Sequence, residues 1–160
     1  MAEIPPLRSR PKGLMRVLMR APLLLYRLGL GGLIGKSTLV LTTTGRRSGR
    51  PRATPANYWE AGGVFYVIAG SGARADWYRN LVARPEVEVQ IGRRRLRAVA
   101  SPLTDPREKA HALWLFGQRS PGTAERYFGV RRGAAEEDLV ALAEQRAIVA
   151  IRPTTNPVNG

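Results

Sequence analysis

Between residues 37 and 101, apolar and polar residues alternate in short segments that are rich in Val, Thr and aromatic side chains. This two-residue period is typical of β-strands that bury one face, and Gly or Pro residues separate the segments. Strands are expected at Ser37–Thr44, Arg52–Trp59, Val64–Ala69, Glu86–Ile91, Arg95–Ser101 and Ile148–Ile151. The short turns between them, at residues 61–63 and at Gly92, favour antiparallel pairing in a barrel or a sandwich.

Helices are expected beside these strands. A short helix is predicted over Asp76–Ala83, with Asp76 as its N-cap. Later in the chain, Asp105 or Thr104 is suited to cap a helix that has Pro106 in its first turn. Apolar spacing predicts helical segments at Arg107–Phe116, Thr123–Val130 and Ala134–Arg146. The fold class is therefore α+β or mainly β, with helices flanking antiparallel strands.

The first 36 residues form a segment of their own in this interpretation. Residues 1–12 are a loose arm rich in proline, and residues 13–28 show apolar residues on one side of a helix and arginines on the other. The apolar run is too short and too charged to span a membrane. Packing on the domain and contact with an anionic membrane surface both remain open. We expect the barrel domain at residues 37–152 and a tail at residues 153–160.

The charge balance indicates an anionic partner. The chain has 26 Lys and Arg residues against 12 Asp and Glu residues, a formal net charge of +14. Such a surplus fits nucleic acid, acidic lipid or a polyanionic small ligand. The absence of cysteine excludes thiol nucleophiles and Cys-ligated metal sites, and no metal site is expected. His111, the only histidine, is interpreted as a helix-face residue rather than a catalytic base.

The segment from Thr42 to Pro55 contains the first candidate site. Four arginines follow the first strand, at positions 46, 47, 50 and 52, between hydroxyl residues and two glycines. Glycines let backbone N–H groups turn toward a ligand, and arginine matches phosphate and carboxylate groups. An anion-binding loop and an exposed hairpin turn with solvated charges are both consistent with this pattern. Pro55 lacks an N–H group, so it is expected at a sheet edge or a bulge.

The segment Gly70–Leu81 contains the second candidate site. Gly70 and Gly72 end the third strand and allow a close approach of the backbone to a ligand. The helix that follows offers free N–H groups at its N-terminus, close to the arginine loop. Trp77 and Tyr78 either cover a flat ring or close the end of the barrel by packing.

Two motifs together carry a family resemblance. The stretch from Leu41 to Arg52 and the sequence Trp77–Tyr78–Arg79–Asn80–Leu81 resemble the deazaflavin (coenzyme F-420)-dependent nitroreductase and quinone reductase family. The likeness runs from about residue 39 to residue 99. It implies a split β-barrel that is flavin-reductase-like. It also implies binding of reduced coenzyme F-420, an 8-hydroxy-5-deazaflavin with a phosphate and an acidic tail.

The resemblance also assigns site residues. Arg46, Arg47, Ser48 and Arg52 would hold the phosphate and the acidic tail. The cofactor site would further include Ala53, Thr54, Pro55, Ala56, Asn57, Ile68, Ala69, Gly70, Ser71, Asp76, Trp77, Tyr78, Arg79 and Asn80. Tyr127 is the candidate aromatic over the substrate, with packing as the alternative. Asn57 followed by Tyr58, and Gly70, differ from the nitroimidazole-reducing members, so reduction of bicyclic nitroimidazoles is not implied.

The resemblance implies an oxidoreductase in which the cofactor supplies the hydride and the protein supplies position and electrostatics. The acceptor would be a small molecule: a quinone, a nitro compound or an activated alkene. The alternatives are a flavin mononucleotide (FMN) enzyme on the same barrel and a non-enzymatic basic module that binds nucleic acid or membrane. Under the first interpretation we expect no nucleic acid partner and a cytoplasmic location. Peripheral membrane contact and a homodimer are left open.

Overall fold

The structure, a computed structural model, describes residues 37–157. The predicted N-terminal arm and amphipathic helix at residues 1–36 lie outside the described residues. Six strands carry most of the fold: β1 (Thr38–Thr44), β2 (Pro51–Ala61), β3 (Val64–Ala69), β4 (Glu86–Ile91), β5 (Arg94–Pro102) and β6 (Ala147–Pro157). The helices are η2 (Gly72–Arg74), α3 (Asp76–Ala83), α4 (Pro106–Arg119), α5 (Pro121–Phe128), η3 (Glu136–Leu139) and α6 (Val140–Glu144).

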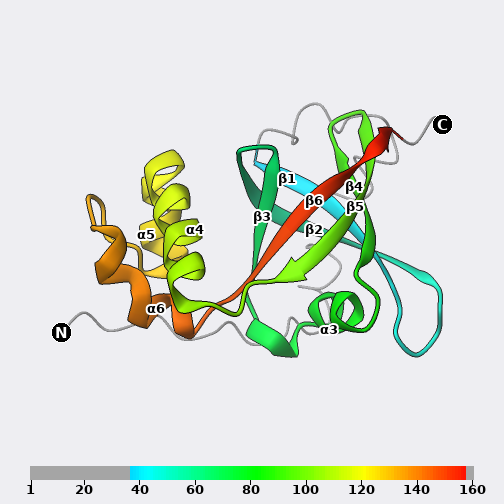
Figure 1. Cartoon of the computed structure of the whole chain (residues 1–160), viewed down its shortest axis with the longest axis horizontal. Coiled ribbons are helices and arrows are strands. Elements are labelled where there is room, and N and C mark those ends of the chain that lie inside the picture. Colours follow the sequence, from blue (N-terminus) through cyan, green and yellow to red (C-terminus); the bar gives the residue numbers. More distant parts are fainter. Residues whose placement is uncertain (1–36, 158–160) are drawn as a thin grey trace.

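The strands form a closed antiparallel barrel in the order β1-β2-β3-β6-β5-β4. This confirms the predicted barrel of antiparallel strands with flanking helices (Figure 1). The two tight hairpins are those that the glycine positions predicted. Gly62 and Gly63 turn the chain between β2 and β3 with positive φ angles of 58° and 77°, which only glycine adopts without strain.

Alternation along the strands divides the side chains between the two faces of the barrel wall. Leu39 and Leu41 are fully buried in the interior, and Thr43 follows them on the same side of β1. The interior cluster also contains Phe65, Val67, Leu81, Val87, Val89, Ala98, Ala100, Val149 and Ile151. Leu81 comes from α3, so this helix covers one end of the barrel core (Figure 1).

A second cluster joins the barrel to a layer of helices. Helices α4, α5 and α6 lie together on one side of the barrel (Figure 1), and residues of β2, β3 and β6 face them. Trp59 of β2 is the central contact: its ring stacks on Phe116 of α4 at 4.7 Å between centroids and on Tyr66 at 5.6 Å. Beside this layer, the pKa of the Arg146 guanidinium is lowered by burial. None of the helices within residues 37–157 is long and apolar enough to cross a membrane.

The structure corrects several details of the predicted elements. The last strand continues to Pro157, well beyond Ile151, because it remains paired with β5. The helix predicted over Ala134–Arg146 is shorter, and its first turn is the 3₁₀ turn η3, a common beginning for a helix.

Candidate cofactor site

The loop between β1 and β2 has a defined backbone shape. The N–H group of Gly45 donates to the carbonyl of Arg50 at 2.8 Å, and the N–H group of Gly49 donates to the carbonyl of Gly45 at 2.7 Å. Gly49 has a φ of 64°. A Cβ atom on Gly45 would lie 2.6 Å from the hydroxyl of Ser48 and 3.2 Å from the Arg50 carbonyl. Gly49 is therefore required by the dihedral angles of the turn, and Gly45 leaves room for the Ser48 hydroxyl and the Arg50 carbonyl.

Arg46 does not project from this loop but folds onto α3. Its guanidinium donates to Oδ1 of Asn80 at 3.0 Å and to Oδ1 of Asp76 at 3.2 Å. It also reaches the backbone carbonyl of Asp76 at 3.4 Å. The Arg46 side chain is 25% exposed, whereas that of Asp76 is 71% exposed. Arg46 thus joins the loop to the first turn of α3.

Asn80 is the buried centre of this connection. It is 5% exposed, and its Oδ1 accepts both the Arg46 guanidinium and, at 3.2 Å, the Arg46 backbone N–H. Its amide nitrogen donates to the hydroxyl of Thr43 at 3.1 Å. The Thr43 hydroxyl in turn donates to the Arg52 carbonyl at 3.4 Å. These bonds fasten both ends of the loop to α3.

The other predicted anion-binding residues are exposed. Arg47, Arg50 and Arg52 lie on the open side of the loop with Ser48. Their guanidinium groups form no hydrogen bond or ion pair with the part of the chain that the structure describes. The Ser48 hydroxyl accepts the Arg50 backbone N–H at 3.3 Å and so supports the turn. Three forked cations are thus available to an anion from solvent.

The N-terminus of α3 faces the same region. The predicted N-cap is shifted by one residue: Ala75 occupies that position, and Asp76 is the first helical residue. Ala75 has no polar side chain, so no side chain caps the first-turn N–H groups. The carboxylate of Asp76 lies at the positive end of the helix dipole, where an anionic ligand group would also be favoured. Arg79, one turn further on, is exposed, and its Nε donates to the Ala73 carbonyl at 3.4 Å.

Strand β2 presents an open edge beside the loop. Its partner β3 pairs only with Tyr58–Ala61, whereas β1 pairs along Pro51–Asn57. The Tyr58 N–H donates to the backbone carbonyl of Ser37, the residue before β1, at 3.1 Å. Successive backbone N–H groups along a strand point to opposite sides. The Pro55 nitrogen therefore faces away from β1, where no described strand pairs with it. This confirms the expected edge position of Pro55.

The residues predicted to line a ring surround this edge. Ala53 and Asn57 are exposed, whereas Thr54, Pro55 and Ala56 are half-buried. Asn57 accepts the hydroxyl of Thr38 across the β1–β2 pair at 3.3 Å. The edge also leaves the Ala53 backbone N–H, which points away from β1, available to a ligand atom.

The predicted residues of β3 divide between two environments. Gly70 and Ser71 are half-buried and precede η2, close in sequence to α3. Ala69 is buried in a small cluster with Ala75 and Ala147. Ile68 packs instead in the cluster between the barrel and the helical layer. Ile68 is thus the predicted cofactor residue whose side chain faces away from the loop.

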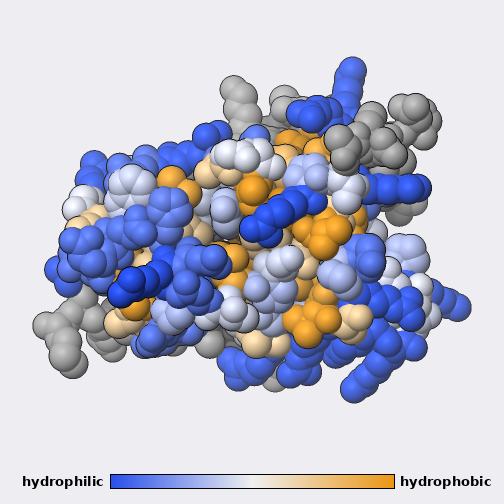
Figure 2. Space-filling view, in the orientation of Figure 1, coloured by the Kyte–Doolittle hydropathy of each residue, from blue (hydrophilic) through white to orange (hydrophobic). Residues whose placement is uncertain are grey.

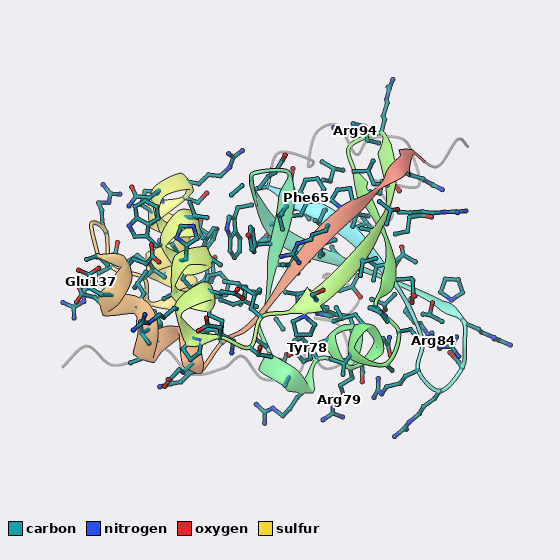
Figure 3. All side chains as sticks on the ribbon, in the orientation of Figure 1. Phe65, Tyr78, Arg79, Arg84, Arg94 and Glu137 are labelled. Carbon is teal, nitrogen blue, oxygen red and sulfur yellow. The ribbon has the colours of Figure 1, made fainter. Side chains whose placement is uncertain are left out.

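Trp77 and Tyr78 pack together at the end of the barrel. Their rings meet edge to face, with centroids 6.2 Å apart. Both rings contact the interior core and the small alanine cluster, and both stay half-buried. Figure 3 shows Tyr78 between α3 and the strands. The packing alternative therefore accounts for part of each ring, and the remaining surface is open to a ligand.

Tyr127 lies apart from these residues. It is on α5, is 42% exposed, and belongs to the layer of helices on the other side of the barrel from α3 and the loop (Figure 1). The structure does not bring it together with the arginine loop. His111 is also in this layer, on α4, where its Nδ1 lies 2.8 Å from a carboxylate oxygen of Glu136. It is a helix-face residue, as the sequence indicated.

Within residues 37–157, charge is unevenly distributed between the barrel and the helical layer. The barrel half, residues 37–102 and 147–157, has twelve arginines and four carboxylates, whereas residues 103–146 have seven basic and seven acidic residues. Figure 3 places Arg79 and Arg84 near the loop end of the barrel and Glu137 in the helical layer. Figure 2 shows hydrophilic side chains projecting around that end.

Residues 37–157 contain no group of three or more His, Asp and Glu side chains that could hold a metal ion. The exposed guanidinium groups of the arginine loop suit an organic anion.

The sequence interpretation missed one residue of the candidate site. Thr43 was noted only as a hydroxyl beside the loop, yet it is 1% exposed and joins Asn80 to Arg52. The alternation of side chains along β1 could have identified it, because Thr43 points to the same inward face of the strand as Leu39 and Leu41. An inward-facing hydroxyl at the end of a strand needs a buried hydrogen-bond partner.

Comparison with known proteins agrees with this arrangement. An F420H(2)-dependent quinone reductase of Mycobacterium tuberculosis (strain H37Rv) is 35% identical over 81 residues, which cover 48% of this chain and 54% of that protein. The match thus spans about half the length of the curated relatives. The solved structure of an F420-H2 dependent reductase (FDR-A) is 27% identical and covers 72% of this chain and 93% of that chain, with a TM-score of 0.52.

A more distant structure shares the fold alone. The heme storage protein HutZ of Vibrio cholerae has a TM-score of 0.53 at 20% identity, covering 82% of this chain and 91% of that chain. The family described as F420H(2)-dependent quinone reductase matches residues 27–134, which include the arginine loop, the open edge of β2 and α3. The chain belongs to the F420H(2)-dependent quinone reductase family.

Proposed function

We propose that this protein binds reduced coenzyme F-420 and reduces a quinone with it. The observation that carries the proposal is the exposed arginine loop held against the N-terminus of α3, within the segment that matches the family. FMN has one phosphate, whereas coenzyme F-420 has a phosphate followed by carboxylates. Three available guanidinium groups and a further three arginines on η2 and α3 or directly after α3 suit the longer anion better.

Each part of the site has a role in this proposal. Arg47, Arg50 and Arg52 would bind the phosphate and tail, with the first-turn N–H groups of α3 beside them. The open edge of β2 from Ala53 to Ala56 would orient the ring, with Trp77 and Tyr78 shielding it from water. When bound, the reduced coenzyme supplies a hydride to an electron-poor acceptor. Nitro compounds and activated alkenes have the same electron demand and are secondary candidates.

The protein does not need a dedicated acid for this reaction. Negative charge that develops on the acceptor oxygen would be stabilised by arginines and free N–H groups at the loop end of the barrel. The proton then comes from water. Tyr127 is the alternative donor, and the Tyr127→Phe variant tests it. We expect an unchanged rate, because Tyr127 lies in the helical layer.

The experiment compares the two cofactors directly on the purified full chain. Coenzyme F-420 and FMN are titrated separately, and the enzyme loaded with reduced coenzyme is then mixed with menadione in a stopped-flow instrument. We expect tighter binding of coenzyme F-420 and rapid oxidation, slowed by deuterium at the hydride position. Preferential binding of FMN would overturn the cofactor assignment. Tight binding without oxidation by quinones, nitroarenes or enones would overturn the enzymatic part.

A further inference from the structure

The buried pair of Asn80 and Thr43 requires an explanation beyond ligand contact. Among the described residues, only three polar side chains are buried, and two of them are hydrogen-bonded to each other here. Buried polar groups are costly unless they are satisfied, and they then specify one arrangement of the backbone. The arrangement they specify is that of the arginine loop.

The hydrogen-bond chemistry fixes the orientation of the Asn80 amide. Two donors of Arg46, its backbone N–H and its guanidinium, point at Oδ1. If the amide were flipped, its NH₂ group would face those two donors, so this orientation is excluded. The amide oxygen has two lone pairs, and Arg46 uses both. Asn80 therefore has no acceptor left for a ligand.

Thr43 links Asn80 to Arg52, at the other end of the loop. Its hydroxyl accepts from the Asn80 amide and donates to the Arg52 carbonyl. Asn80 thus fixes the loop where it begins, at Arg46, and where it ends, at Arg52. Between these two positions stand Arg47 and Arg50, the exposed residues that face solvent.

We propose that Asn80 is a positioning residue, which acts with Thr43 to hold the loop in the shape that presents its arginines to an anion. The proposal rests on the proposed function for the identity of that anion. It changes the role that the family resemblance implied for Asn80: the side chain shapes the loop, and the exposed arginines contact the ligand. A preformed loop loses less conformational freedom on binding, which raises the affinity.

The test removes the hydroxyl without changing the volume of the side chain. Thr43→Val leaves the Asn80 amide without its acceptor, whereas Thr43→Ser keeps the hydroxyl. Thr42→Val is the matched control, since it makes the same change at the neighbouring position, where no side-chain hydrogen bond to the described residues is formed. Coenzyme F-420 is the probe for affinity. Hydrogen exchange of the Gly45 and Gly49 amides, without coenzyme, reports the loop itself.

In Thr43→Val we expect the dissociation constant to rise roughly five- to tenfold, as for loss of a buried hydrogen bond. The two loop amides should exchange faster, and kcat at saturating coenzyme should fall much less than the affinity. Thr43→Ser should restore most of the affinity, and Thr42→Val should match the wild type. A general loss of stability would move all exchange rates together and leave the affinity of the folded protein unchanged.

The outcomes separate the two proposals. If the wild type does not bind coenzyme F-420, the proposed function fails, and the exchange rates still decide the role of Asn80. If the wild type binds and Thr43→Val binds equally well with unchanged loop exchange, the positioning role is overturned. Should Thr43→Val not fold, Asn80→Asp replaces it. That variant keeps the acceptor for Arg46, but its carboxylate draws the Thr43 hydroxyl away from the Arg52 carbonyl. Backbone amides near Arg52 should then exchange faster, and those near Arg46 should not.

Discussion

Arg46 has a different role from the other arginines of its loop, although the residue type is the same. Its guanidinium is held by Asn80 and Asp76 of α3, whereas Arg47 faces solvent. The sequence predicted a cluster of cations at an anion site, and it predicted α3 near that loop. It did not assign Arg46 to a contact within the protein. That contact depends on the distance between two segments thirty residues apart, which only the folded barrel defines.

The carboxylate of Asp76 is expected to compete with an anionic ligand at this point. It pairs with Arg46 and lies in the first turn of α3, where a phosphate would also be favoured. Asp76→Asn is therefore expected to raise the affinity for coenzyme F-420 by roughly two- to fivefold, the range for an exposed charge interaction. The same change should lower the free energy of unfolding slightly, because α3 loses a favourable charge at its N-terminus.

The two effects of Asp76→Asn are measured by a binding titration and by urea unfolding. Glu86→Gln is the control, since it removes an exposed carboxylate at the start of β4, outside the α3 helix. A fall in affinity in Asp76→Asn would mean that the carboxylate orders Arg46 for the ligand rather than competing with it.

At the scale of elements, the turn chemistry was the most predictable part of the site. The spacing of Gly45 and Gly49 indicated a tight loop, and both glycines have the packing or dihedral angle that such a loop requires. Strand periods were equally informative where one face is buried. They failed beyond Ile151, where the sequence Arg-Pro-Thr-Thr-Asn-Pro has no alternation and pairing with β5 maintains the strand.

Gly45→Ala should weaken binding more than it weakens the fold. The added Cβ would lie 2.6 Å from the Ser48 hydroxyl, which must rotate away and release the Arg50 N–H, and 3.2 Å from the Arg50 carbonyl, which must shift slightly. We expect the affinity for coenzyme F-420 to fall by roughly tenfold or more, equivalent to at least about 1.4 kcal/mol, which is within the range for overpacking. Isothermal titration measures this change directly.

Gly92→Ala is the matched control for the loop variant. Gly92 has a φ of 58° with open space around its Cβ position, and it turns the β4–β5 hairpin. Alanine there should lower the free energy of unfolding by roughly 1–2 kcal/mol, and the affinity should stay the same. Equal losses of affinity in both variants would show that stability alone, rather than loop shape, determines binding.

At the scale of the whole molecule, charge separates the barrel from the helical layer. The composition predicted an anionic partner but could not locate it, because the arginines are spread along the entire sequence. Folding gathers twelve of them in the barrel half, with four carboxylates, and leaves the helical layer balanced. Such a charge distribution is expected to attract an anion toward the barrel before any contact forms. Residues far from the ligand then influence the rate of association rather than the rate of dissociation.

Two adjacent arginine pairs allow this distribution to be tested, because both double variants lose two positive charges and so have the same net charge. Arg93 and Arg94 lie in the β4–β5 hairpin, and Arg131 and Arg132 lie in a turn of the helical layer; all four are exposed. Each pair is changed to glutamine, and association of coenzyme F-420 is followed by stopped flow at low ionic strength, where the screening length is about 30 Å at 0.01 M. The hairpin variant should associate severalfold more slowly, with an unchanged dissociation rate and a weaker dependence on salt. The helical variant should lose less, because its charges stand among carboxylates. Equal slowing by the two pairs would show that total charge, and not its concentration on the barrel, brings the anion to the site.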